Sequence, residues 1–231
     1  MWKQLLRSLA SGGQVEPLPP DRGGGFYVYR VSLPEGFKDV VSLVPHDSAF
    51  ESGIAGEAIV GVCTELLEKG ELVTVSNFRP NKRFLDLLHS VIAKHAPNSK
   101  ALQAEARRQG TGWVYLIDAR TPTPAGEVPP HDVIGAFEVR DGEIVLESYQ
   151  ANANHRIFSS DGLFRLEPTL HEQLMVRVTK ANTTSQDGTG YQVAAPARRS
   201  RKAERRRVSA IVGLIFACRR DHRRIERSVP S

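Results

Sequence analysis

The sequence predicts an α+β protein, in which short strands and a few helices follow one another without regular alternation. Several short segments are rich in β-branched and aromatic residues, and glycine, proline and Asp-Gly turns separate them, which is typical of antiparallel strands. Residues 84–95 carry apolar side chains at i, i+3, i+4 and i+7, the spacing of an amphipathic helix. The strands do not alternate with helices in βαβ units, so a parallel sheet is not expected.

The length of 231 residues fits one large domain or two small ones, with room for a substantial core. A content of 40% hydrophobic and 25% charged residues is ordinary for a globular protein, and no apolar run reaches the roughly 20 residues that span a bilayer. We therefore expect a flexible lead-in over residues 1–25, a folded domain over 26–180, and a linker with a basic and apolar tail over 181–231.

Basic residues gather near the C-terminus. Residues 198–227 hold 12 Lys or Arg against 3 Asp or Glu, which leaves about −4 on the rest of a chain whose net charge is +5. Such a run is usually solvated, although it can also contact nucleic acid or an anionic surface. Aromatic residues do not interleave with it, so the run lacks aromatic side chains on which the bases of single-stranded nucleic acid could stack.

The apolar segment 208–217 is too short to span a membrane, and we expect it to bury against the body or a partner subunit.

Seven strands are expected. The first follows a glycine triplet, and the third is mostly apolar, so we expect the third to be central and covered on both faces. Arg140-Asp141-Gly142 marks a hairpin between the fourth and the fifth. The predicted strands are residues 26–31, 71–76, 111–119, 132–139, 143–147, 163–166 and 174–178.

Two helices are expected. Residues 55–69 are predicted to form a helix that ends at Gly70, a typical C-cap. The amphipathic helix follows a turn at residues 77–81 and stops before Pro97. Proline and glycine interrupt residues 32–56, where we expect loops with one or two helical turns.

Three features carry groups suited to chemistry. Arg30 lies near the end of the first strand; a lone arginine there is usually a solvated surface residue, but its planar fork can also grip a phosphate or carboxylate. Thr74 and Ser76 put hydroxyls at the end of the second strand, and Glu147 puts a carboxylate on a late strand. In chain order they form an anion-binding arginine, a pair of small hydroxyls and a carboxylate.

This order resembles the ADP-ribosyltransferase toxins, specifically their pertussis-like and cholera-like A subunits. In that family a strand of the Val-Tyr-Arg type comes first, a Ser-Thr-Ser strand second and a catalytic glutamate third. The resemblance spans about residues 26–220 as short pieces in the same order. The pieces similar to the family are residues 27–31, 74–76, 103–115, 132–136 and 208–213.

The resemblance implies a split β-sheet core with flanking helices, and an NAD-dependent mono-ADP-ribosyltransferase that transfers ADP-ribose from NAD to a host protein or nucleic acid. Arg30 would orient the NAD phosphates, with Tyr29 beside it in the NAD site. Thr74 and Ser76 would shape the floor under the nicotinamide and ribose. Glu147 would stabilise the oxocarbenium-like charge that grows as the nicotinamide bond breaks.

The position of the catalytic carboxylate stays open. When the family's pattern is aligned at His155 and counted back without gaps, Gln150 falls at the catalytic position. When it is aligned at Tyr149, which resembles a tyrosine of the family, and counted forward, Asn152 falls there. Glu143 is a further candidate beside Glu147. Two other interpretations also stay open: a binding protein on the same fold that has lost turnover, and a basic nucleic-acid-binding protein.

The two cysteines, Cys63 and Cys218, do not form a CxxC motif, so we expect two free thiols or one long-range disulfide and no metal site. In the pertussis-like subunits, a cysteine upstream of the hydroxyl strand is bridged to one near the C-terminus. The resemblance therefore implies a Cys63–Cys218 disulfide, a secreted toxin and a receptor-binding B oligomer as a further partner. Residues 1–10 nevertheless make a poor signal peptide, because Lys3 and Arg7 interrupt them.

Overall fold

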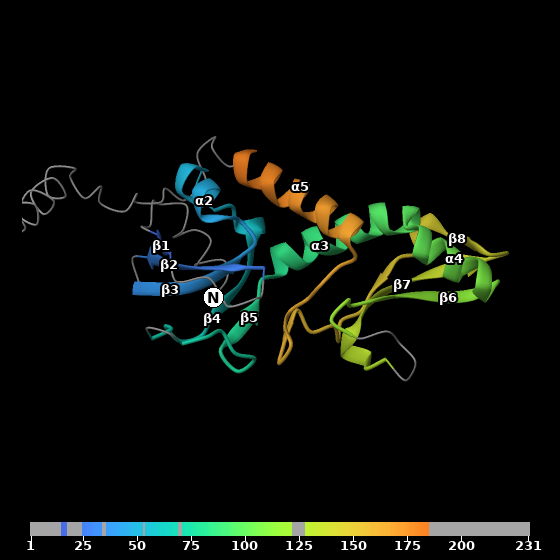
Figure 1. The fold of residues 1–231 in the computed structure, drawn as a ribbon, viewed down its shortest axis with the longest axis horizontal. Helices are drawn as coiled ribbons and strands as arrows, with labels where there is room; N and C mark the ends of the chain where they lie inside the picture. Colours follow the sequence, from blue (N-terminus) through green and yellow to red (C-terminus); the bar gives the residue numbers. More distant parts are fainter. Residues whose placement is uncertain are drawn as a thin grey trace, which may run out of the picture. The chain divides into compact units, whose positions relative to one another are not determined.

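Antiparallel strands near the N-terminus form a five-stranded sheet in the computed structural model, which describes residues 15–17, 25–33, 36–52, 54–68, 71–121 and 128–184 (Figure 1). The strand Tyr27–Leu33 pairs with the strand Gly36–Ser42 in a register that places Arg30 opposite Asp39. Gly61 lets an aromatic ring lie directly over its strand, because a Cβ there would come within 2.3 Å of the Phe78 ring. The strands lie in chain order and are β1 (Val15–Pro17), β2 (Tyr27–Leu33), β3 (Gly36–Ser42), β4 (Ile59–Cys63) and β5 (Phe78–Pro80).

A second antiparallel sheet follows later in the chain. Its central hairpin turns through Asp141 and Gly142, whose φ values of 51° and 79° suit the left-handed pair of a two-residue type I′ turn. The sheet has the order β6 (Gly112–Ile117), β7 (Val133–Arg140), β8 (Glu143–Ile144), and β9 (Gln150–Ala151) also pairs with β7. A separate hairpin pairs β10 (Phe158–Ser159) with β11 (Gly162–Leu163).

Helices pack against these sheets. Asn81 caps the N-terminus of α3, because its side chain accepts a hydrogen bond from the backbone N–H of Arg83. Phe84, Leu88 and Ile92 recur on one face of α3 and are buried. The described helices are α2 (His46–Ser52), α3 (Lys82–His95), α4 (Lys100–Gln109) and α5 (Pro168–Thr184), with the 3₁₀ turns η1 (Gly56–Ala58), η2 (Ala96–Asn98), η3 (Pro130–Asp132) and η4 (Leu146–Ser148).

Helix α3 joins the two sheets through one apolar core. It contacts β4 of the first sheet and η4 beside the second, and α5 lies alongside it (Figure 1). Helix α4 packs against β6 and β8. The fully buried side chains come from both sheets and from the helices, and the large ones include Tyr29, Phe84, Phe137 and Leu174.

The mixture of helices with antiparallel sheets confirms the α+β class. The first predicted strand corresponds to β2, the amphipathic helix to α3, and the hairpin at residues 140–142 joins β7 to β8. The finer prediction, a split sheet of the ADP-ribosyltransferase type, stays a prediction.

Several predicted elements are wrong. The helix predicted over residues 55–69 is wrong, because the buried, β-branched run Ile59–Cys63 forms β4. Residues 71–76 are irregular and turn-forming instead of a strand. The short, mostly apolar segment 174–178, predicted as a strand, lies inside α5, and Gly36–Ser42 is a strand where loops were expected.

Two errors concern the second sheet. Strand β6 was expected to be central and covered on both faces, but among the described residues it pairs only with β7 and is an edge strand. The strand predicted over residues 143–147 ends at Ile144, so Glu147 lies in η4 and not on a strand.

All described residues belong to one compact unit, residues 1–194. The predicted basic and apolar tail lies outside the described residues, and so does the lead-in apart from Val15–Pro17 and Gly25. In the described part of the chain, no helix is long and apolar enough to cross a bilayer.

Candidate functional site

Arg30 is held by a buried carboxylate of its own sheet. Its Nε and one terminal nitrogen donate to the two Asp39 carboxylate oxygens at 2.8 Å and 2.9 Å, and Asp39 is completely buried. The same Arg30 nitrogen donates to the Leu67 carbonyl oxygen at 2.7 Å, and the Leu67 N–H donates to Asp39 at 2.7 Å. This bidentate pair connects the loop after β4 to the first sheet. The Arg30 guanidinium, predicted to bind a phosphate, thus binds the Asp39 carboxylate.

Tyr29 is a core residue. It is completely buried, and its hydroxyl donates to the Val44 carbonyl oxygen at 2.5 Å. Burial, with smaller contributions from Tyr27 and Asp47, raises the pKa of Tyr29 far above its ordinary value. A side chain enclosed in this way stabilises the first sheet and does not present a surface to NAD.

Thr74 and Ser76 lie together on an exposed turn before β5. Their hydroxyl oxygens are 3.0 Å apart, and the Asn77 side chain accepts a hydrogen bond from the Thr74 N–H at 2.8 Å. The pair therefore shapes its own turn and faces solvent. It does not form the end of a strand.

Glu147 lies far along the chain, in η4 between β8 and β9, and is exposed. The structure thus brings Thr74 and Ser76 together but places Arg30 on the first sheet and Glu147 beside the second.

The other candidates for the carboxylate position differ in their surroundings. Gln150 is exposed on β9. Asn152 donates to the carbonyl oxygens of Pro130 and Val133, both at 2.7 Å, and so holds a loop in place. Glu143, on β8, lines a cleft.

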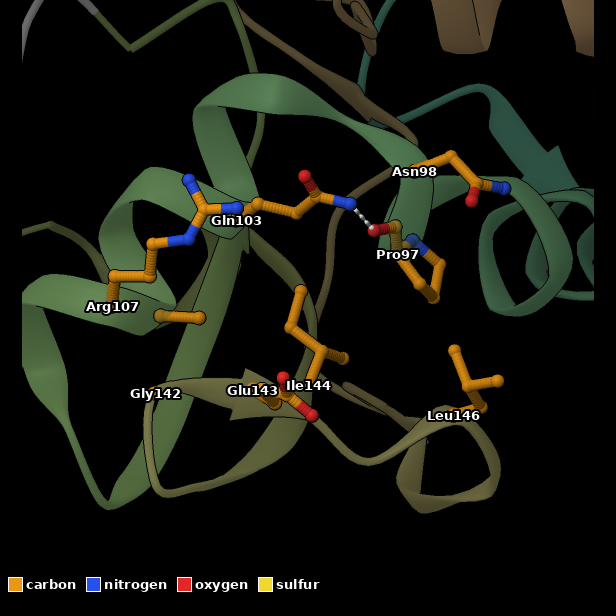
Figure 2. Close-up of a pocket in the computed structure, with 9 residues that line it drawn as sticks. Pro97, Asn98, Gln103, Arg107, Gly142, Glu143, Ile144 and Leu146 are labelled. Atoms are coloured by element: carbon orange, nitrogen blue, oxygen red, sulfur yellow. Dashed lines mark hydrogen bonds between the residues drawn. The ribbon is translucent and has the colours of Figure 1, made fainter.

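This cleft has a volume of about 260 Å³ and lies between α4 with η2 on one side and β8 with η4 on the other (Figure 2). Arg107 and Glu143 are exposed at opposite sides of it. Neither side chain forms a hydrogen bond or an ion pair with another described residue. The cleft therefore offers one guanidinium and one carboxylate to a ligand. Its lining residues are Pro97, Asn98, Gln103, Ala106, Arg107, Gly142, Glu143, Ile144 and Leu146.

Backbone contacts fix the walls of the cleft. The Gly142 N–H donates to the Gly110 carbonyl oxygen at 2.6 Å, which joins the β7–β8 turn to the end of α4. The Gln103 amide nitrogen donates to the Pro97 carbonyl oxygen at 2.9 Å (Figure 2). This bond fixes the Gln103 side chain against η2.

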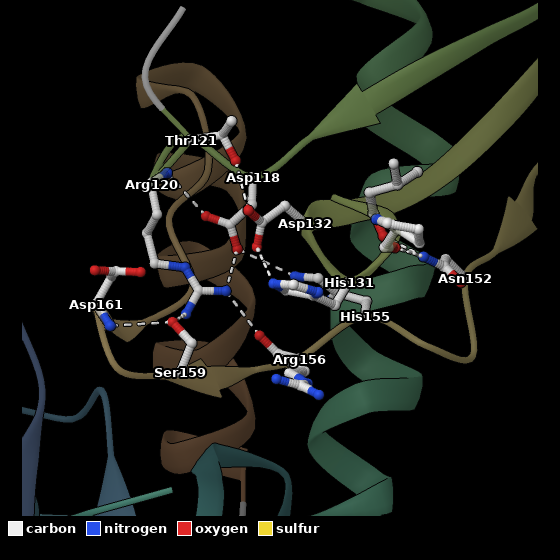
Figure 3. Close-up of polar contacts among 12 residues, drawn as sticks. Asp118, Arg120, Thr121, His131, Asp132, Asn152, His155, Arg156, Ser159 and Asp161 are labelled. Atoms are coloured by element: carbon white, nitrogen blue, oxygen red, sulfur yellow. Dashed lines mark hydrogen bonds and ion pairs between the residues drawn. The ribbon is translucent and has the colours of Figure 1, made fainter. Parts of the chain in front are cut away.

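A buried ionic cluster supports the end of β6 (Figure 3). Asp118 is completely buried and accepts hydrogen bonds from the Arg120 guanidinium at 2.8 Å and from His155 Nε2 at 3.1 Å. The backbone N–H groups of Arg120 and Arg165 donate to its other oxygen, both at 3.0 Å. Burial alone would raise the pKa of Asp118, but these hydrogen bonds, led by that from His155, outweigh it and lower the pKa.

The Asp118 cluster is a structural junction. Arg120 also donates to Ser159, to the Gly162 carbonyl oxygen and to the Arg156 carbonyl oxygen, at 2.6–2.8 Å. It thereby joins the end of β6 to the β10–β11 hairpin. The side chains of Asp118, Arg120 and His155 are at most 3% exposed, so a ligand in solution does not reach them.

A second, half-buried histidine lies close to this junction. His89 on α3 forms a 2.8 Å hydrogen bond between its Nδ1 and the Tyr149 hydroxyl. Burial, followed by the nearby His155, lowers the pKa of His89. Gly135 makes room for the Tyr149 ring, since a Cβ there would lie 2.6 Å from it.

Cys63 is buried on β4 and has no disulfide partner among the described residues. Burial, with a smaller contribution from Asp39, raises its pKa to about 12. Cys218 lies outside the described residues, so the Cys63–Cys218 disulfide stays a prediction.

The sequence did not identify Arg107 or Gln103 as site residues, although both lie in the segment similar to the toxin family. Their four-residue spacing on α4 was the available signal, because residues i and i+4 share a helix face. Within the described residues, no group of three or more His, Cys, Asp or Glu side chains is placed to hold a metal ion. Comparison with models of protein families, with curated proteins and with solved structures found no match.

Proposed function

We propose that this chain is a binding protein for a small zwitterion, such as a free amino acid or a dipeptide, and that the ligand occupies the cleft between α4 and β8. The observation that carries this proposal is the pair of opposite charges, Arg107 and Glu143, which line one cleft and have no ion-pair partner among the described residues.

The chemistry of the lining suits such a ligand. The planar guanidinium of Arg107 can accept a carboxylate in bidentate geometry, and Glu143 can accept hydrogen bonds from an ammonium group. Gln103 and Asn98 add polar groups, and Ile144 contributes an apolar wall. Because Arg107 and Glu143 are exposed, solvent screens both charges and we expect modest affinity.

The size of the cleft also favours a small ligand. Its volume of about 260 Å³ is just below the roughly 300–1,000 Å³ typical of pockets for drug-sized ligands. NAD, which contains two nucleotides, is larger than such ligands.

Calorimetric titration tests the proposal. The full-length protein is titrated with a panel of free amino acids and dipeptides, and with acetate and ethylammonium as ligands of single charge. We expect a zwitterion to bind more tightly than either single-charge ligand. Arg107→Gln and Glu143→Gln should each weaken binding by about 10-fold or more, since a hydrogen bond to a charged group contributes about 1.5–3 kcal/mol.

Two matched variants serve as controls. Arg83→Gln and Glu172→Gln remove the same charges from exposed positions on α3 and α5, away from the cleft, and should leave the affinity unchanged. The proposal is wrong if no zwitterion binds at millimolar concentration, or if the cleft variants bind as well as the controls.

A second candidate function is the ADP-ribosyltransferase that the sequence resemblance implies. The observation that favours it is that Glu143, one of the carboxylates left open by the sequence, lines the same cleft as Arg107. Release of nicotinamide from NAD separates the two candidates. Release that Glu143→Gln or Glu147→Gln abolishes, and Glu172→Gln does not, would favour the transferase over the binding protein.

A further inference from the structure

Strand β6 has an open edge. It pairs with β7 along one side, and along the other side no described strand or loop forms backbone hydrogen bonds with Gly112–Ile117. The nearest such bond begins after the strand, where the Ala119 N–H donates to the Arg165 carbonyl oxygen. Alternate residues of this six-residue strand therefore present unpaired backbone donors and acceptors on this side, while the others bond to β7.

The strand also exposes large aromatic side chains. Trp113 and Tyr115 point away from the core and are 37% and 57% exposed, whereas Val114 and Leu116 are buried on the opposite face. Helix α4 covers the buried face. In the described part of the chain, the aromatic face of β6 is thus partly exposed to solvent.

Edge strands in soluble proteins are usually protected by a charged residue, a proline or a bulge in the strand. The sequence of β6, Gly-Trp-Val-Tyr-Leu-Ile, contains neither a charge nor a proline. Its register against β7 is regular from Gly112 to Leu116 and shifts only at Ile117. Such an edge favours pairing with a further strand.

We propose that β6 pairs antiparallel with β6 of a second copy of this chain, around a two-fold axis at Val114. In this register Trp113 lies opposite Tyr115 of the second copy, and the symmetry repeats the same pair. Cross-strand aromatic pairs stabilise a sheet. On the other face, the large side chain of Leu116 lies opposite Gly112, so the two do not clash.

The charges beside the proposed β6–β6 contact are compatible with a second copy. Glu138, which lies opposite Trp113 on β7, is already paired with Arg140 at 2.7 Å. Residues 112–116 bring no charge of their own, so the two-fold axis does not place like charges opposite one another within this register. A six-residue strand buries less area than a standard stable interface, and we expect a dissociation constant on the order of micromolar.

Sedimentation equilibrium of the full-length protein over a range of about 1–200 μM tests this proposal. We expect a monomer–dimer equilibrium. Trp113→Lys combined with Tyr115→Lys places two positive charges opposite each other at both pairs, and should make the protein monomeric. Trp113→Lys combined with Tyr115→Glu has the same number of changed residues but pairs opposite charges, and should retain the dimer.

Val176→Lys is the matched control, since Val176 is an exposed apolar residue on α5. This variant should dimerise as the parent does. Circular dichroism checks that each variant is folded. The proposal is overturned if the parent is monomeric at 200 μM, or if the two double variants dimerise equally. It is also overturned if those amide protons of β6 that face the open edge, and not β7, are protected from exchange equally at low and high protein concentration, because another segment then covers the edge.

Discussion

Replacing Arg30 by Ala removes the cation that pairs with Asp39 and leaves a carboxylate with no exposure to solvent. Breaking one side of a buried ion pair typically costs 3–5 kcal/mol, because the remaining charge is neither solvated nor paired. The Leu67 N–H is then the only remaining hydrogen-bond donor to Asp39 among the contacts described above. We therefore expect Arg30→Ala to lower the free energy of unfolding by about 4–5 kcal/mol.

The reverse replacement should cost less. Asp39→Ala leaves the Arg30 guanidinium, whose side chain is 25% exposed and can regain part of its hydration. It also keeps its hydrogen bond to the Leu67 carbonyl oxygen. A loss of about 3 kcal/mol, at the lower end of the range, is the expected outcome.

Urea denaturation at neutral pH, followed by circular dichroism, measures both losses. Arg83→Ala is the control for an exposed arginine and should change stability by less than about 1 kcal/mol. A loss of 1 kcal/mol or less for Arg30→Ala would refute the structural role of Arg30, and would return it to the candidates for anion binding.

Three further predictions concern the second sheet and β4. The pKa of Asp118 is lower in the folded protein than in the unfolded chain, so its stabilising contribution is complete above the unfolded pKa and is lost as the pH falls through the folded pKa. Asp118→Asn should therefore reduce the dependence of the free energy of unfolding on pH in this range. An unchanged pH dependence would argue against this role of Asp118. Gly135→Ala should destabilise the protein by about 1–3 kcal/mol in urea denaturation, because its Cβ would lie 2.6 Å from the Tyr149 ring. Once the protein has been reduced and the reductant removed, Cys63 should react with a thiol reagent far more slowly in the native than in the denatured protein, since the thiol is buried and its pKa is raised to about 12. Equal rates would contradict its burial.

Local sequence patterns predicted the elements whose signals are contained within a few residues. The buried face of α3 follows from the spacing of its apolar residues, and Asn81 provides its cap. Asp141-Gly142 supplies the positive φ values that the β7–β8 turn requires. In these places the local chemistry is sufficient, because neighbouring residues form the whole element.

Short apolar runs could not be assigned in the same way. Ile59–Cys63 and residues 174–178 are both short, mostly apolar segments, yet the first is a strand and the second is part of α5. The period of an apolar run this short does not distinguish a buried strand from a helix. Tertiary pairing decided each case.

The candidate site depends on pairings that the sequence does not contain. Arg30 meets Asp39 only because β2 and β3 pair in one register. Arg107 and Glu143 share a cleft because α4 packs against β8. Similarly, the apolar composition of β6 fits a central strand, and only the order of the strands reveals it as an edge.

A nitrogen–proton correlation spectrum of the labelled full-length protein, titrated separately with dipeptides and with NAD, tests the central claim most directly. We predict that a dipeptide shifts the signals of the residues around Arg107 and Glu143, and that Arg107→Gln abolishes these shifts. NAD should not shift signals around Arg30 and Ser76. The account is contradicted if NAD shifts the signals of Arg30, Ser76 and Glu147 together while the dipeptides leave the cleft unchanged.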